Sequence, residues 1–209
     1  MALGDSYATL LQLKTRLSIS AGDSGDDPSL TNALSSASRA IEGYCGRQFN
    51  DAGAVTARVY YPDSLTTVLV DDFSTTNGLI VGLDYSNAGT YSTILASTNY
   101  QLEPLNGVVD GTPGWPFYRI RAIQTWYPLW WTSIGDPRTS IQITAQWGWA
   151  IVPPSVVEAC LILAEDLYRL KDAVFGVAGF DANGAVRVRE NPKVGSLLMR
   201  YQRSPILVA

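Results

Sequence analysis

The chain has 209 residues, enough to bury a core that needs neither a disulfide nor a metal, and a formal net charge of −4. It contains no histidine, the commonest general base and zinc ligand, so we expect neither an enzyme nor a cofactor. No stretch reaches the roughly 18 consecutive apolar residues of a membrane span, and no membrane partner is expected.

Two helices are predicted in the first 50 residues. The first begins at Asp5 or Ser6, whose side chains can cap free backbone N–H groups, and runs to about Ser18. The second enters at Asp27-Pro28, because Asp can cap a helix and Pro has the right φ for its first turn. It ends between Gly43 and Gly46, since glycine favours the C-terminal cap.

From about Ala54 the pattern changes to β-branched and aromatic residues separated by turns. Alternating apolar and polar positions predict a mostly antiparallel subdomain that extends to residue 150. Asn77-Gly78 is a strong tight-turn signal between two of its strands. The predicted strands cover 58–61, 66–70, 79–81, 91–95, 100–102, 118–123 and 140–147.

A third helix is predicted from Ser155 to about Lys171, with apolar residues on more than one side. It should be the central helix, covered by the first two. Residues 176–184 are typical of a flexible loop, and a short last helix from Pro192 to about Tyr201 precedes an extended tail.

These elements predict an α+β fold, in which a small helical bundle from the N-terminal and C-terminal halves carries an inserted, mostly antiparallel β-subdomain. Cys45 and Cys160 fall in apolar stretches of the helices, and we predict two buried thiols in a reducing compartment. The expected divisions of the chain are 1–53, 54–150, 151–175 and 176–209.

Three motifs resemble chemical sites but lack a required feature. The acidic loop with Asp23, Asp26 and Asp27 lacks the ligand spacing of a calcium loop and is interpreted as a capping loop. Asp71 and Asp72 are neighbours on a predicted strand, so they point to opposite faces and cannot share one substrate atom. Residues 111–114 lack the lysine of a phosphate-binding loop and are interpreted as a turn.

Aromatic residues are concentrated between residues 115 and 149. One interpretation is that most of them pack the core of the β-subdomain. A second is that Trp126, Tyr127, Trp130 and Trp131 belong to a loop that anchors a neighbouring subunit, because buried Trp and Tyr are common interface hot spots. A third is that the tryptophans stack on sugar rings, which would make the protein a carbohydrate-binding module.

The C-terminal end is basic, unlike the rest. Residues 1–183 hold 10 basic and 18 acidic side chains (−8), whereas residues 184–209 hold 5 basic and 1 acidic (+4). The basic end is either a solvated helix face or a surface that meets an acidic partner or phosphates. An apolar tail that is too short to form a core element follows and is suited to pairing with another chain. The residues concerned are Arg187, Arg189, Lys193, Arg200, Arg203, Ile206, Leu207 and Val208.

Both helical ends of the sequence resemble the head–tail connector proteins of long-tailed bacteriophages, also called adaptor or head-completion proteins. The β-subdomain departs from the shortest, all-helical members and resembles the longer type. The segments that carry the resemblance are Tyr7–Lys14, Ser36–Phe49, Val152–Cys160 and Tyr168–Asp172.

The resemblance implies a structural virion protein, assembled in the cytoplasm of a host bacterium. It implies a ring of subunits, commonly twelve, that docks beneath the portal protein and extends the DNA channel. The next connector or tail-side protein would bind its other side, and DNA would pass without sequence-specific binding. By analogy, residues 187–209 would form the portal-docking arm.

Overall fold

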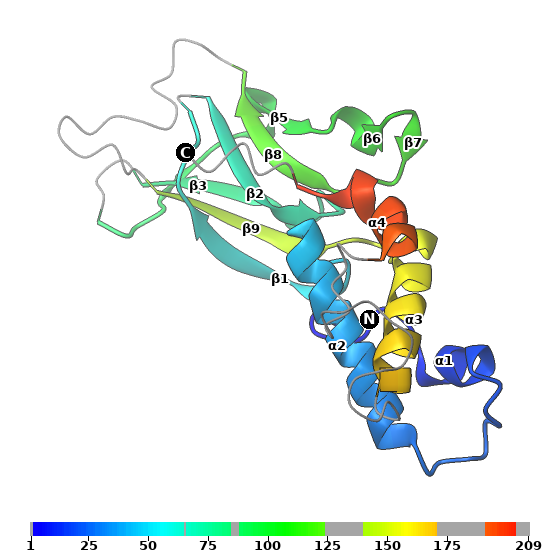
Figure 1. Ribbon diagram of the computed structural model, residues 1–209. Coiled ribbons are helices and arrows are strands. Elements are labelled where there is room, and N and C mark those ends of the chain that lie inside the picture. The colour runs from blue at the N-terminus through cyan, green and yellow to red at the C-terminus, as the bar shows by residue number, and fades with distance from the viewer. Residues whose placement is uncertain (1, 65, 85–87, 124–139, 171–190, 204–209) are drawn as a thin grey trace. The chain divides into compact units, whose positions relative to one another are not determined.

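The computed structural model describes residues 2–64, 66–84, 88–123, 140–170 and 191–203. They form two compact units, a helical unit from Leu3–Asn50 and the described residues of 151–203, and a sheet unit from Asp51–Ala150. The α+β fold predicted from the sequence is confirmed, because helices come before and after a stretch of antiparallel β-structure along the chain (Figure 1).

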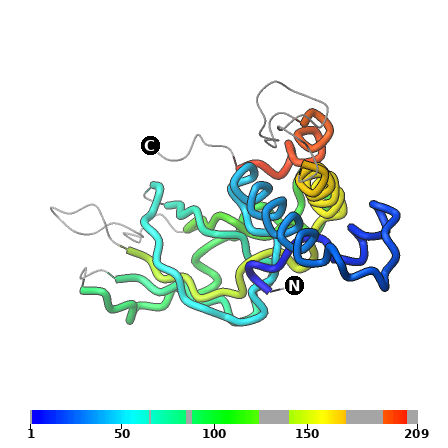
Figure 2. Tube along the Cα trace, turned by 60° about the horizontal axis from the view of Figure 1, so that its bottom comes forward, coloured from blue at the N-terminus to red at the C-terminus, as the bar shows by residue number. Residues whose placement is uncertain are grey.

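In the helical unit, α2 and α3 pack side by side, α1 contacts both of them, and α4 packs on α3 (Figure 2). A short 3-10 turn at Met199–Tyr201 follows the last helix. The helices are α1 (Leu10–Arg16), α2 (Asp27–Cys45), α3 (Pro154–Arg169) and α4 (Pro192–Leu198).

The two long helices follow the sequence pattern closely. The apolar stripe of α2 is buried, and the helix ends at Gly46, whose φ of +62° is a left-handed conformation that glycine adopts at little cost. In α3 the buried residues lie on more than one side, which suits a helix in contact with three others. Cys45 and Cys160 are buried free thiols, as predicted.

The predicted start of the first helix at Asp5 or Ser6 is wrong. Thr9 caps α1 in a capping box with Gln12, so the helix begins four residues later. The preceding backbone is held elsewhere, since the Tyr7 N–H donates to Ser38 Oγ at 3.0 Å. Asp27 is likewise the first residue of α2 rather than its cap.

Among the described residues all strand pairs are antiparallel, and the main sheet has seven strands. Their order is β4-β3-β9-β2-β8-β5, with β1 paired to β9 outside this path. A separate hairpin joins β6 and β7, so residues 112–113 of the predicted turn are in fact strand. The strands are β1 (Asp51–Tyr60), β2 (Thr67–Phe73), β3 (Ile80–Leu83), β4 (Thr93–Ile94), β5 (Tyr100–Glu103), β6 (Val108–Val109), β7 (Thr112–Pro113), β8 (Phe117–Ala122) and β9 (Ile141–Gly148).

Strand β9 pairs with three other strands of the sheet, β1, β2 and β3. The tight turn at Asn77-Gly78 forms, with the Leu79 N–H donating to the Thr76 carbonyl at 3.1 Å, but the strands that flank it do not pair with each other. Both β2 and β3 pair with β9 instead. This arrangement buries alternate residues of β9 in the core between the apolar faces of β2, β3 and β8.

We expect the α2 stripe to dominate the stability of the helical unit. Leu34→Ala removes a side chain that is 2% exposed and should lower the free energy of unfolding by about 2–4 kcal/mol, because it leaves a cavity. Leu11→Ala, at a site 59% exposed, is the matched control and should cost under about 1 kcal/mol. Urea unfolding followed by circular dichroism measures both, and equal losses would contradict the assigned packing.

Candidate interaction surfaces

The paired carboxylates of β2 serve structure. Asp71 lies 2.5 Å from Arg58 Nη1 and accepts a 2.8 Å hydrogen bond from the Tyr60 hydroxyl, both at Oδ2. The buried Asp72 accepts from Trp149 Nε1 at 2.8 Å. The two groups have different partners, as the alternation of the strand predicts, and do not converge on one point.

The acidic loop ties three helices together. Lys14, only 4% exposed, lies 2.5 Å from Asp27 Oδ1 and donates to the Asp23 carbonyl at 2.7 Å. The Tyr168 hydroxyl on α3 donates to Asp26 Oδ2 at 2.7 Å. Across the described ranges, no group of three or more His, Cys, Asp and Glu side chains could hold a metal ion. The described helices include none that is long and apolar enough to cross a membrane.

A hollow of about 260 Å³ lies between α2 and α3. Its lining has two serine hydroxyls but neither a carboxylate nor a lysine that could activate them. The lining residues are Ser29, Ala33, Ser36, Leu167 and Tyr168. The residues that line this hollow therefore include no activated nucleophile.

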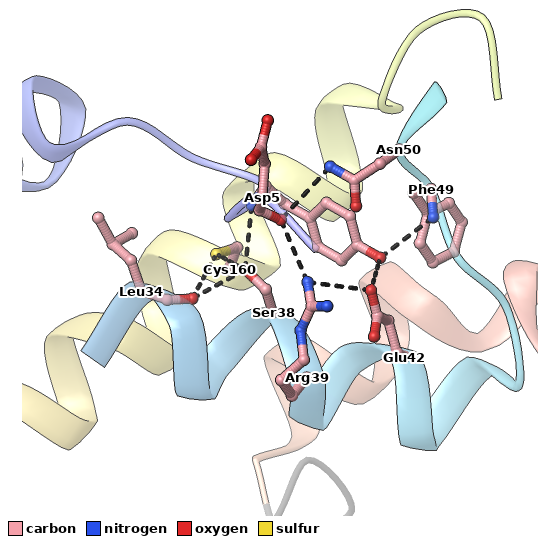
Figure 3. A network of polar contacts seen from close by, with 9 residues as sticks. Asp5, Leu34, Ser38, Arg39, Glu42, Phe49, Asn50 and Cys160 are labelled. Atoms are coloured by element: carbon pink, nitrogen blue, oxygen red, sulfur yellow. Dashed lines mark hydrogen bonds and ion pairs between the residues drawn. The ribbon is translucent and has the colours of Figure 1, made fainter. Parts of the chain in front are cut away.

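A network of polar contacts connects distant segments of the helical unit (Figure 3). The Tyr7 hydroxyl donates to Glu42 Oε1 at 2.7 Å and accepts from the Phe49 N–H at 3.1 Å. Arg39 Nη2 lies 3.0 Å from the same Glu42 oxygen and donates to the Asp5 carbonyl at 3.1 Å. The network thus joins the segment before α1, the last turns of α2 and the chain that leaves α2.

The network extends to α3 through Ser38. Its hydroxyl accepts from the Tyr7 N–H, donates to the Leu34 carbonyl at 2.8 Å and lies 3.4 Å from Cys160 Sγ (Figure 3). Burial raises the pKa of Cys160, and raises that of Cys45 to about 12, so neither thiol is a ready nucleophile at neutral pH. Burial and the hydrogen bond to Glu42 raise the pKa of Tyr7 above its ordinary range.

The sheet face opposite the core has an uncharged half. Residues paired across antiparallel strands share a face, and Val59, Gln142, Gly82 and Ile94 form one such row over β1, β9, β3 and β4. The next row holds Ala57, Thr144 and Ile80, and the third pairs Val55 with Gln146. The exposed fractions are 44% for Val55, 52% for Val59, 45% for Ile80 and 58% for Ile94.

The other half of this face, over β2, β8 and β5, is charged. Arg119 pairs with Glu103 across β8 and β5, and its Nη1 lies 3.3 Å from Glu103 Oε2. Arg121, two residues along β8, places Nε 2.7 Å from Glu103 Oε1. The two halves of one sheet face therefore differ in chemistry. Sequence alternation hints at the uncharged strands, but the strand order that joins them comes only from the fold.

The aromatic residues divide into two groups. Trp115, Trp147 and Trp149 are buried, and the rings of Trp115 and Trp149 lie 5.1 Å apart. These three pack the sheet unit, in agreement with the first interpretation. The predicted interface residues Trp126, Tyr127, Trp130 and Trp131 lie outside the described residues, and their role stays a prediction.

The basic C-terminal end is described only in part. Lys193 and Arg200 are exposed on the last helix and the turn that follows it, which leaves their charges accessible to a partner. Arg203 is half-buried, and its N–H donates to the Cys45 carbonyl at 2.9 Å. Arg187, Arg189, Ile206, Leu207 and Val208 lie outside the described residues.

No protein-family model and no curated protein matches the sequence. The fold is similar to chains in three solved structures, each 19% identical to this one. A chain from the neck of an empty gene transfer agent particle, with C6 symmetry, has a TM-score of 0.56 and covers 97% of this chain and 93% of that chain.

A chain from the virion of a native gene transfer agent particle has a TM-score of 0.59, with 100% of this chain and 96% of that chain covered. A chain from the neck of the native particle, with C12 symmetry, has a TM-score of 0.51, with 100% and 99% covered. The similarity extends over both units, so the whole α+β fold is shared.

Tyr7→Phe tests the polar network. The variant loses the hydroxyl that binds Glu42 and leaves the Phe49 N–H without its acceptor, so the free energy of unfolding at pH 7 should fall by about 2–3 kcal/mol. Tyr61→Phe, at a ring 63% exposed, should change it by less than about 0.5 kcal/mol. Chemical denaturation compares the two, and a neutral Tyr7→Phe would refute the network's contribution.

Alkaline pH should destabilise the fold partly through Tyr7. Its folded-state pKa is raised, so above pH 10 the unfolded chain releases this proton while the folded chain keeps it. The free energy of unfolding then falls with pH by up to about 1.4 kcal/mol per unit for this group. In Tyr7→Phe the free energy of unfolding should fall less steeply above pH 10, because this variant lacks the proton that Tyr7 would release on unfolding. Equal slopes in denaturation series would show that Tyr7 ionises alike in both states.

Proposed function

We propose that the chain is a structural virion protein of the neck of a phage-like particle. It forms a ring of twelve copies beneath the portal protein, extends the DNA channel and presents a platform to the next connector or tail-side protein. One observation carries the proposal: the fold is shared from end to end with chains from gene transfer agent necks solved with C6 and C12 symmetry.

The residues behind the bacteriophage resemblance support the proposal independently. Tyr7, Ser38, Glu42, Phe49 and Cys160 come from three of the resembling segments, and all of them meet in the network of Figure 3. Segments that lie far apart in the sequence thus form one hydrogen-bond network. Residues that hold the fold together are what a structural protein family has in common. An enzyme family would instead have reactive residues in common.

The charge distribution suits a channel through which DNA slides. Residues 1–183 sum to −8, and acidic surface repels phosphates instead of holding them. DNA would therefore pass without sequence-specific binding and without chemical turnover. The protein would reside at the head–tail neck after assembly in the cytoplasm of the bacterial host.

In this ring the C-terminal arm, residues 187–209, docks on the portal. Its described part presents Lys193 and Arg200 to solvent, where an acidic portal surface can reach them. The apolar residues Ile206, Leu207 and Val208 would enter a groove or sheet edge of the portal. Trp126, Tyr127, Trp130 and Trp131 would contact the neighbouring subunit.

Electron microscopy of the protein alone and mixed with portal tests the function. We expect a closed ring seated on the portal, whose docking is lost when residues 204–209 are deleted. Lys193→Glu combined with Arg200→Glu should weaken docking at least tenfold, because it reverses the accessible charge of the arm.

Arg169→Glu is the matched control, since it reverses an exposed charge on α3, where the side chain is 65% accessible and pairs only with Glu165 among the described residues. It should leave docking within about twofold of the wild type. A wild-type protein that forms no ring with or without portal would refute the proposed function. Docking that survives the tail deletion would refute the arm alone.

A further inference from the structure

Among the described strands, β1 is a long sheet edge whose regular part, from Val55 to Tyr60, carries no outward charge. Within the described ranges its pairing partner is β9, and the regular register runs from Val55 to Tyr60 (Figure 1). Edges in monomeric proteins are commonly blunted by lysine, proline or an outward charge. This strand has neither proline nor lysine, and its one carboxylate, Asp51, lies before the irregularity that precedes Val55. Its single arginine, Arg58, turns to the core side, where it lies over the Trp147 ring at 4.6 Å and pairs with Asp71.

The uncharged sheet face adjoins this edge. Its three rows hold apolar side chains and the neutral hydrogen-bonding groups of Gln142, Thr144 and Gln146. The Asp51 carboxylate borders the third row, where it accepts from Gln146 Nε2 at 2.8 Å. On the other half of the same face, Arg119, Arg121 and Glu103 satisfy one another in ion pairs. One half is thus suited to solvent, whereas the other leaves four large apolar side chains between 44% and 58% exposed.

Charge indicates what covers the uncharged half. A nucleic acid would be recognised by lysine and arginine side chains and a basic protein by carboxylates, and the three rows of this face hold neither. A second copy of this acidic chain faces the opposite problem, because −8 over residues 1–183 makes most approaches between copies repulsive. A contact between copies is favoured where carboxylates are absent and neutral donors and acceptors are present.

The size of the face indicates what kind of contact it makes. Four strands about 4.8 Å apart and five residues at about 3.3 Å give roughly 300 Å². A stable interface buries about 800 Å² on each partner, so the face supplies less than half of that area. Further area must come from other parts of the chain and from ring closure, in which every copy has a neighbour on both sides.

We propose that a second copy of this chain packs against the uncharged face and the β1 edge, and that this contact is one side of the subunit interface in the ring. The inference rests on the proposed function and adds the surface that joins the copies. In a cyclic ring the contact is heterologous, so the face meets a different surface of the next copy. Two copies joined by this contact alone bind weakly, because the contact is small. Ring assembly is therefore cooperative.

Val59→Lys tests the contact in the full-length chain. Native mass spectrometry and electron microscopy would follow assembly over a concentration series, alone and with portal. The new charge should raise the midpoint of ring assembly at least tenfold, since the ammonium loses its hydration in the contact. Ile80→Lys, on the neighbouring row, is a second variant in case the first is poorly folded, and circular dichroism checks both.

Leu105→Lys is the matched control. It lies in the same unit but off this face, and at 54% exposed it is as accessible as Val59. Its assembly midpoint should stay within about twofold of the wild type. If folded Val59→Lys and Ile80→Lys assemble like Leu105→Lys, the face is not the contact, although the proposed ring stands. If the wild type never assembles, both proposals are overturned, and a closed dimer that Val59→Lys abolishes would keep the contact but overturn the ring.

Discussion

The Tyr7 hydroxyl holds together parts of the helical unit that lie far apart in the sequence. It bonds to Glu42 on α2 and to the backbone of Phe49, where the chain leaves the helix. The Phe49 ring in turn stands edge-on to both Tyr7 and Tyr201, at 5.6 Å from each. One buried phenol, together with the Phe49 ring, therefore fixes the N-terminal segment, the exit from α2 and the turn at Met199–Tyr201. The packing of the helices depends on this point because three of the connections converge there.

The sheet unit depends on a different element, β9, which is the last of its strands in the sequence. Strand β9 pairs with β1, with β3 and, at Phe73, with β2. Its core side carries Ile141, Ile143, Ala145 and Trp147, and its outer side carries the neutral polar residues of the uncharged face. The same alternation thus produces the core and the surface that we assign to a second copy. A substitution in β9 that shifted its register by one residue would exchange the two.

The sequence predicted the long helices well, because an apolar stripe, Pro at the start and Gly46 at the end of α2 act locally. It failed at the start of α1, where the capping box of Thr9 and Gln12 and the bond from Tyr7 to Ser38 outweigh the capping signals of Asp5 and Ser6. The polar network could not be derived from spacing, since Tyr7, Glu42 and Cys160 meet only in the folded unit. The uncharged face was equally hidden, because Val59, Gln142 and Ile94 belong to one row only once the strand order is known.

The contacts of Tyr201 and Arg203 with the end of α2 have a mechanical consequence. Arg203 is bonded to the Cys45 carbonyl, and Tyr201 contacts Phe49, two residues before the sheet unit begins at Asp51. Tension applied beyond Arg203 would enter the fold at the end of α2, beside the covalent junction with β1. It would reach the sheet through a few residues and leave α1 and the acidic loop outside the path. This path carries load from the C-terminal side of Arg203 to the sheet while the helices keep their packing.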